Sequence, residues 1–250
     1  MIDTHAHLGD SCFDGDFDEV VVRAQSAGVT HCVVVGEHPR EAERIQAIRA
    51  RWPEWAMCGL GLFPAMFTEA DITTFDALAE SYSWDCIGEV GLDTWIVREA
   101  SDRAWHEEVF RHVVRTAIRK DIPVNVHSRN TGLRVVEILR ELGAKKVHLH
   151  AFDAKGSTVE LGVEAGFYFS IPASVIHSPQ KQKLAKRVPL EQLLLETDSP
   201  VLGPDRGSRN EPMNVKIALD VSAQIKDMTP EALERVTDEN ALRLYGRAHI

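Results

Sequence analysis

Short apolar runs alternate with longer amphipathic segments along the whole chain. The apolar runs predict eight β-strands, at residues 1–5, 31–37, 56–62, 86–92, 122–128, 146–152, 166–172 and 193–199. Between them, apolar positions recur with the period of a helix, as in residues 16–28 and 106–120. Gly28, Gly143 and Gly166 follow such segments, where the end of a helix favours glycine. Strands and helices are therefore expected to alternate throughout the chain.

The predicted strands are almost continuously apolar, which indicates strands buried on both faces of a parallel sheet. Eight such strands, each followed by a helix, are typical of an α/β protein with the (β/α)8 TIM barrel. A chain of 250 residues has the usual length of one barrel, so we predict a single TIM-barrel domain over residues 1–250. A doubly wound open sheet is the alternative, because periodicity does not show whether a sheet closes.

The last part of the chain departs from this alternation. Residues 199–212 form a long segment rich in glycine and proline, and long loops in compact domains are often functional. Residues 229–236 and 237–246 then predict two short helices, with Thr229 and Thr237 as their N-caps.

Polar side chains stand at the carboxyl ends of several predicted strands. These residues are His5, His7, Glu89, His127, His150 and Asp198. In a TIM barrel such strand ends meet at one mouth, and residues two apart on a strand, such as His5 and His7, share a face. Charges there are costly without a partner, and imidazole and carboxylate groups are ligands of divalent metals. Six ligands exceed the need of one tetrahedral site, so we expect two divalent ions about 3.5–4 Å apart, with a carboxylate bridging them.

The other histidines have weaker claims to a functional role. His148 alternates with His150 on its strand, and we interpret it as an orienting or core histidine. His38 follows the second predicted strand and is a candidate for substrate contact. No functional role is predicted for the remaining ones, which are His31, His106, His112, His177 and His249.

Composition limits the range of partners. The formal net charge of −10 argues against a broad nucleic-acid-binding surface, although metal ions can supply positive charge locally. No apolar run approaches the roughly 20 residues of a membrane span, and we expect a cytoplasmic protein. The four cysteines are dispersed and are predicted to be free thiols; they are Cys12, Cys32, Cys58 and Cys86.

Several motifs recur together in one known family. They are, in chain order, DTHAHL, GEVGLD, PVNVHSRN, HAFD, LETDSP, RNEP and NALRLYG. In this order the chain resembles the TatD family of metal-dependent deoxyribonucleases over essentially its whole length. The segments HAFDAKGS, FYFSIPASV and QKQKL are similar to those of the subgroup with archaeal and eukaryotic members.

The resemblance implies a TIM barrel with a two-metal centre that hydrolyses phosphodiesters, often as a 3′→5′ exonuclease on DNA ends. Carried over by position, it implies that His5, His7 and Asp198 hold one ion. His127 and His150 would hold the other, and Glu89 would bridge the two. Zinc, magnesium and manganese are the candidate metals, and Asp198 and Glu89 are the candidate catalytic residues.

Five further residues are predicted to contact the substrate. Arg129, Lys155, Arg206 and Arg209 are candidates for binding phosphate, and Trp95 is a candidate for stacking on a base. In one place the chain departs from the family, because GLFPAMF has Phe63 where the family usually reads GxHP. A hydrocarbon ring cannot donate a hydrogen bond to a phosphate oxygen.

Two other functions remain open. A hydrolase of C–N bonds in small molecules uses a similar metal centre, and the acidic charge and Phe63 favour it. Such enzymes commonly have a modified lysine on the fourth strand, where this chain has Glu89. A non-catalytic metal-binding protein is the second alternative, and the presence of all six predicted ligands argues against it.

Overall fold

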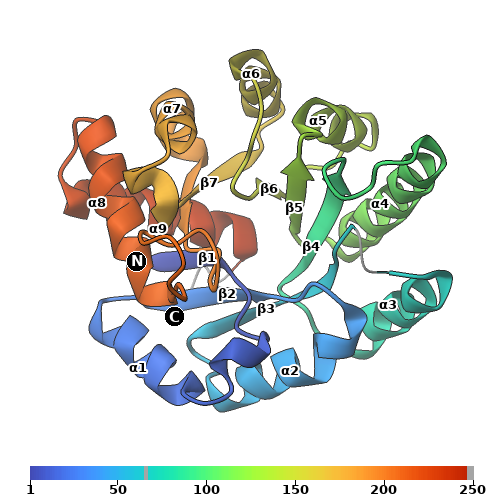
Figure 1. The fold of residues 1–250 in the computed structure, drawn as a ribbon, viewed down its shortest axis with the longest axis horizontal. Coiled ribbons are helices and arrows are strands. Elements are labelled where there is room, and N and C mark those ends of the chain that lie inside the picture. The colour runs from blue at the N-terminus through green and yellow to red at the C-terminus, as the bar shows by residue number, and fades with distance from the viewer. Residues whose placement is uncertain (65–66, 247–250) are drawn as a thin grey trace.

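The computed structural model of the protein describes residues 1–64 and 67–246. Eight parallel strands follow one another in chain order around a barrel (Figure 1). They are β1 (Ile2–Ala6), β2 (His31–Val35), β3 (Ala56–Leu62), β4 (Cys86–Asp93), β5 (Val124–Arg129), β6 (Val147–Leu149), β7 (Tyr168–Pro172) and β8 (Leu193–Glu196). The chain after β8 pairs with β1 through a parallel bridge between Ala6 and Ser199. The predicted barrel is therefore confirmed, and the doubly wound open sheet is wrong.

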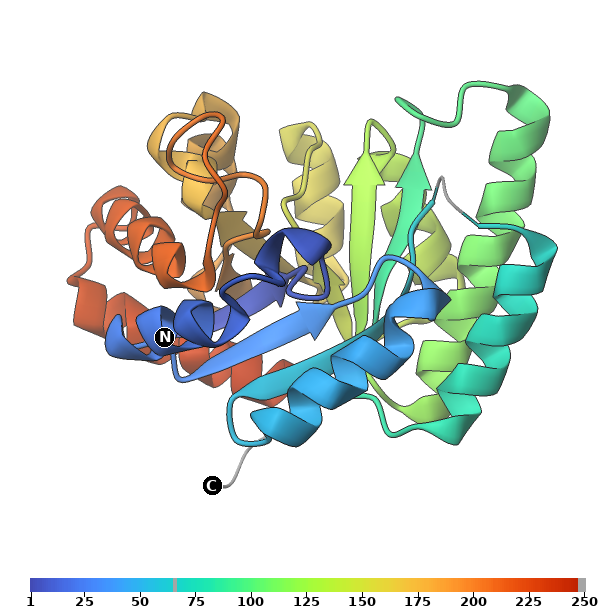
Figure 2. The same cartoon turned by 60° about the horizontal axis from the view of Figure 1, so that its bottom comes forward.

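Helices pack around the outside of the strands (Figure 2). The α-helices are α1 (Phe17–Ser26), α2 (Ala42–Arg51), α3 (Glu69–Ser81), α4 (Ala100–Lys120), α5 (Gly132–Glu141), α6 (Gly156–Glu164), α7 (Pro179–Arg187), α8 (Val215–Ile225) and α9 (Pro230–Tyr245). Short 3-10 helices are η1 (Ser11–Phe13), η2 (Pro39–Glu41), η3 (Ala173–Ile176), η4 (Leu190–Gln192) and η5 (Pro212–Asn214). Gly28, Gly143 and Gly166 follow α1, α5 and α6 with positive φ, as predicted for helix ends.

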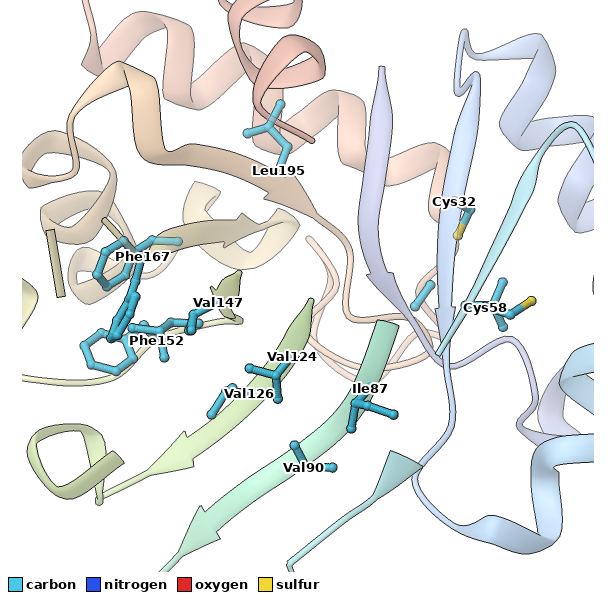
Figure 3. Packing of buried hydrophobic residues seen from close by; sticks show 14 of the residues in the cluster. Cys32, Cys58, Ile87, Val90, Val124, Val126, Val147, Phe152, Phe167 and Leu195 are labelled. Carbon is cyan, nitrogen blue, oxygen red and sulfur yellow. The ribbon is translucent and has the colours of Figure 1, made fainter. Parts of the chain in front are cut away.

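The strands bury apolar side chains on both faces, which is why their sequences are almost continuously apolar. On β2, Val34 belongs to the large cluster between the strands and the helices, whereas Val33 and Val35 belong to a smaller cluster inside the barrel. Figure 3 shows residues of the large cluster, among them Ile87 and Val124. Three of the four cysteines are buried, and each of the four is a thiol, as predicted.

The C-terminal helix α9 differs from the prediction. It is one continuous helix, so the expected boundary at Thr237 is wrong. Thr229 caps its first turn by accepting from the Ala232 N–H, whereas Thr237 is buried in mid-helix, where its hydroxyl bonds to carbonyls one turn earlier. The last turn contributes Leu244 and Tyr245 to the inner cluster, so α9 packs against the interior of the barrel.

Three predicted strands, β2, β6 and β8, end earlier than expected, and the last two precede predicted ligands. Strand β6 stops at Leu149 and β8 stops at Glu196, so His150 and Asp198 lie in the loops that follow. Asp198 has a φ of 57°, in the left-handed region. The polar residues thus leave the regular ladder where the backbone turns away from the sheet. No helix in the described part of the chain is long and apolar enough to cross a membrane.

Candidate metal centre

All six predicted ligands lie together at the mouth of the barrel, where the carboxyl ends of the strands meet. Glu89 lies within β4, and His7, His150 and Asp198 lie in the loops just after their strands. Five of the six are at least nine-tenths buried, namely His5, His7, Glu89, His150 and Asp198. His127 is slightly more accessible, with 15% of its side chain exposed. The strand ends of a closed barrel point to one mouth, which explains how residues from position 5 to position 198 converge.

One set of donor atoms faces one oxygen of Glu89. His5 Nε2 and His7 Nε2 lie 3.0 Å apart, at 3.5 Å and 3.3 Å from Asp198 Oδ1. Glu89 Oε2 lies 3.2 Å from His7 Nε2 and 3.9 Å from His5 Nε2. His5 of β1, His7 just after it and Asp198 of the β8 loop therefore share this side of the Glu89 carboxylate.

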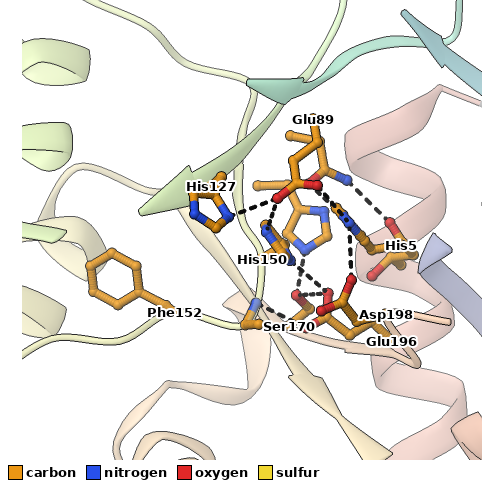
Figure 4. A network of polar contacts seen from close by, with 12 residues as sticks. His5, Glu89, His127, His150, Phe152, Ser170, Glu196 and Asp198 are labelled. Atoms are coloured by element: carbon orange, nitrogen blue, oxygen red, sulfur yellow. Dashed lines mark hydrogen bonds and ion pairs between the residues drawn. The ribbon is translucent and has the colours of Figure 1, made fainter. Parts of the chain in front are cut away.

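A second set faces the other oxygen of Glu89. Glu89 Oε1 lies 2.7 Å from His127 Nδ1 and 2.9 Å from His150 Nε2. Figure 4 shows Glu89 between His127 and His150 on one side and His5 and Asp198 on the other. The carboxylate therefore stands between two sets of donors, with one oxygen directed to each.

Hydrogen bonds outside the centre orient two of the imidazoles. His5 Nδ1 lies 2.9 Å from Asn125 Oδ1, and the Asn125 amide donates in turn to Tyr245 Oη. His127 Nε2 lies 3.0 Å from Asp93 Oδ2. Such partners set the tautomer and direction of a ligating histidine.

A buried carboxylate supports the loops that carry His150 and Asp198. Glu196 accepts hydrogen bonds from the Ala151 N–H and from the Ser170 hydroxyl, at 2.8 Å and 2.6 Å. Ser170 Oγ lies 2.6 Å from His148 Nε2, and His148 Nδ1 lies 2.7 Å from Tyr245 Oη. His148 is thus a buried member of a supporting network, in agreement with its interpretation from the sequence.

The Asp198 loop has its own anchor in Asp3. The Thr197 N–H and hydroxyl both donate to the carboxylate of Asp3, at 2.9 Å and 2.6 Å. The Asp198 N–H donates to the carbonyl of His5 at 2.9 Å. These bonds fix Asp198 beside His5 and His7.

The charges at the centre balance one another. Burial opposes the charged form of Glu89, but the neighbouring His150, His127 and His7 hold its pKa well below the ordinary value. Burial also opposes a charge on His127, but Asp93 and Glu89 raise its pKa to about 9. In His7 burial is likewise outweighed by Asp198 and Glu89, which raise its pKa. The carboxylates therefore favour positive charge on His7 and His127.

The donor atoms fit divalent metal. They are imidazole nitrogens and carboxylate oxygens, the ligand types of zinc, manganese and related ions. Three overlapping clusters of residues could each hold an ion, because the donor atoms within each cluster lie within 4.8 Å of one another. They are His5, Glu89 and His150; His5, His7 and Asp198; and His7, Glu37 and Glu89. A bound cation would offset the negative charge of the Glu89 and Asp198 carboxylates.

A cavity of about 740 Å³ opens over the donors. Arg129 and Arg206, two of the residues expected to bind phosphate, line this cavity. The guanidinium of Arg129 lies 4.0 Å above the ring of Trp95, which is 54% exposed. Phe63 also lines the cavity and packs edge-on against His127, with 4.8 Å between ring centroids.

The other two expected phosphate-binding residues lie elsewhere. Lys155 is exposed at the start of α6 and does not line the cavity. Arg209 forms ion pairs with Asp16 and Glu211, and its guanidinium also packs over the ring of Phe13. Its charge is therefore engaged by carboxylates of the protein itself.

The histidines with weaker claims are placed as follows. His38 does not line the cavity; its Nδ1 accepts from the Arg40 N–H and caps η2. His177, for which no role was predicted, does line the cavity, and its Nε2 lies 3.2 Å from the carbonyl of Gly203. His249 lies outside the described residues.

Sequence reasoning missed several residues of the site. Glu37 follows β2 and Asp93 ends β4, so the same strand-end rule that found Glu89 could have found both. Lys181 lies on α7 and lines the cavity, but no local signal distinguishes it from the neighbouring lysines. Burial raises the pKa of Glu37 and lowers that of Lys181.

The barrel and the clusters of possible metal ligands at its mouth define the class of protein, a metal-dependent hydrolase built on a TIM barrel. The family model described as "TatD related DNase" matches residues 2–246. The chain therefore belongs to the TatD family, whose members are hydrolases that act on ester bonds.

Relatives cover the chain almost completely. It is 40% identical to human "Deoxyribonuclease TATDN3", over 99% of this chain and 95% of that protein. It is 34% identical to the "Uncharacterized metal-dependent hydrolase YabD" of Bacillus subtilis, over 98% of each chain. The crystal structure of the TatD homologue YJJV from Escherichia coli has the same fold, with a TM-score of 0.89 at 22% identity and 98% coverage of both chains. The resemblance seen in the motifs is thus confirmed.

Proposed function

We propose that this protein is a two-metal phosphodiesterase that acts on the ends of DNA. The position of Glu89 carries the proposal, since its two oxygens face two separate sets of donors. His5, His7 and Asp198 would hold one ion. His127 and His150 would hold the other, with Glu89 shared between them.

The chain's own residues would position the reactants. Bound divalent ions would supply Lewis acidity, which offsets phosphate charge and lowers the pKa of a water. Asp198 would accept a proton from the attacking water on a carboxylate oxygen, because it lies at the cavity beside the donors. Asn125 and Asp93 would keep His5 and His127 in one orientation while the charge on the phosphate changes.

Local positive charge reconciles a DNA substrate with a net charge of −10. Arg129 and Arg206 line the cavity and can each neutralise a phosphate close to the cleaved bond. Trp95 lies beneath Arg129 and offers an exposed ring on which a terminal base can stack. This arrangement supports engagement of a strand end and not of a long duplex.

Linear DNA should be hydrolysed, and circular DNA should be cut poorly. With about two phosphates neutralised by protein side chains, log affinity should fall with log salt with a slope of about −2. Arg206→Gln should reduce that slope by about one, and Lys155→Gln, at an exposed position outside the cavity, should leave it unchanged. Binding of fluorescent oligonucleotides at several salt concentrations measures this slope for each variant. If metal-loaded protein cuts neither form of DNA but hydrolyses a small cyclic amide, the nuclease proposal is wrong.

Replacing Phe63 by histidine should raise the rate on DNA about tenfold. The new imidazole would lie at the cavity next to His127 and could donate a hydrogen bond to a charged phosphate oxygen, a contact worth about 1.5 kcal/mol. Phe63→Leu is the matched control, since it also removes the ring but adds no donor. Equal rates for the two variants under metal saturation would show that a donor at position 63 has no role.

A further inference from the structure

Lys181 is a buried cation beside the metal centre. It belongs to α7, lines the cavity and is only 7% exposed. Among the described residues, no carboxylate lies within ion-pair distance of its ammonium group. Instead, Nζ donates to the main-chain carbonyl of Ala151 and lies 3.4 Å from that of Phe152. A lysine this deeply buried is uncommon, and here its ammonium group is bound by main-chain carbonyls of the loop after β6.

The backbone that Lys181 holds carries a predicted metal ligand. Ala151 directly follows His150 and has a φ of 39°, which is unfavourable for a residue with a Cβ. Its N–H donates to Glu196 Oε1 at 2.8 Å, and its carbonyl accepts from Lys181. The two peptide groups on either side of the Ala151 Cα are therefore both held by buried charged side chains.

His150 depends on this backbone more than His127, the other imidazole of the second donor set, does. His127 is oriented by Asp93 through its distal nitrogen. By contrast, His150 Nδ1 is buried without a hydrogen-bond partner, and Glu196 Oε2 remains 3.9 Å away. The His150 ring stacks on the ring of His5, with 3.9 Å between centroids, but no hydrogen bond fixes its Nδ1 edge. Its direction within the plane of that stack therefore depends on the conformation of the main chain.

We propose that Lys181 is a positioning residue for the metal position formed by His127, His150 and Glu89. By holding the Ala151 carbonyl, it keeps the backbone in the strained conformation that directs His150 Nε2 toward Glu89. The inference rests on the proposed two-metal centre, and it adds a residue of α7 to the side chains that support the site.

Metal titration without DNA tests the inference. Mn²⁺ binding is measured by calorimetry for the wild type and for Lys181→Met, which keeps the length of the side chain but loses its charge. We expect the variant to bind one ion as the wild type does and the other about 10- to 100-fold more weakly. Lys183→Met is the matched control, because Lys183 is exposed on the same helix, and it should bind both ions normally.

A second variant separates positioning from a general loss of folding. Ala151→Gly removes the cost of the positive φ, so the double variant Lys181→Met/Ala151→Gly should recover part of the lost affinity. Equal weakening of both ions, or no recovery in the double variant, would overturn the proposal. So would unchanged binding of both ions together with a raised KM for DNA, which would make Lys181 a phosphate-binding residue instead.

The outcome is separable from the proposed function. A wild-type protein that binds only one ion would overturn the two-metal centre and this inference with it. If the wild type binds two ions and Lys181→Met does too, only the role of Lys181 is wrong. Failure to cleave DNA would leave the metal titration, and the conclusion drawn from it, intact.

Discussion

Glu89→Ala should lose both metal ions and at least about a thousandfold in the rate of DNA hydrolysis. The carboxylate faces both donor sets, so its removal leaves neither set with a shared anionic ligand. Lewis-acid stabilisation of the transition state is worth several kcal/mol, and about 4 kcal/mol corresponds to three orders of magnitude. Mass spectrometry of the metal content and rates on a linear oligonucleotide measure the two effects.

His7→Ala is the matched comparison for Glu89→Ala. His7 faces only the donor set that includes Asp198 and one oxygen of Glu89. Its loss should therefore weaken one ion and leave the other bound. Retention of two ions per chain by Glu89→Ala would contradict the bridging role, whatever the activity of that variant.

Asp198→Asn should lower kcat on DNA by about 10²- to 10⁴-fold, even at saturating metal. The amide keeps the size of the carboxylate but cannot accept the proton of the attacking water, and general-base catalysis is worth that much. KM should change little, since Arg129 and Arg206 are untouched. Steady-state rates in rising Mn²⁺ concentrations separate the loss of a base from the loss of a ligand.

Asp10→Asn is the control for that experiment. Asp10 lines the same cavity and is exposed, and its carboxylate accepts from the Cys12 N–H. Its main-chain N–H donates to the carbonyl of His7, a contact that the substitution leaves in place. It should retain the wild-type kcat. Full recovery of Asp198→Asn at high Mn²⁺ would show that Asp198 acts as a ligand alone, and another group would then have to take the proton.

The order of elements and the position of the donors could be derived from the sequence alone. Strands buried on both faces are almost continuously apolar, and eight such runs separated by helical periods predict a barrel. Because a barrel brings all its carboxyl ends to one mouth, the positions of His5 on β1, Glu89 on β4 and Asp198 just after β8 were enough to predict that they meet. The strand-end rule is a consequence of topology and needs no knowledge of side-chain contacts.

The ends of the elements were less predictable. Thr237 follows an apparent helix start, yet α9 continues through it because packing against the barrel interior stabilises the whole helix. The apolar runs likewise continue past β6 and β8, where the backbone leaves the ladder to place His150 and Asp198. A run of apolar residues indicates burial, and burial alone does not distinguish a strand from a buried loop.

Only the tertiary structure decided which residues support the candidate centre and which line the cavity over it. Asn125, Tyr245 and Lys181 come from a strand interior and two helices, so no local pattern relates them to the ligands. Arg206 and Arg209 lie three residues apart in one loop, yet one lines the cavity and the other pairs with Asp16. Such differences depend on which distant side chain lies within a few ångströms, and hydrogen bonds and ion pairs are decided at that distance. The sequence by itself determined a barrel with candidate metal ligands at its mouth, because the strands follow from periodicity along the chain and the candidate ligands follow from their positions near the strand ends. The tertiary structure decided how that centre is held, because its supports are contacts between segments far apart in the sequence.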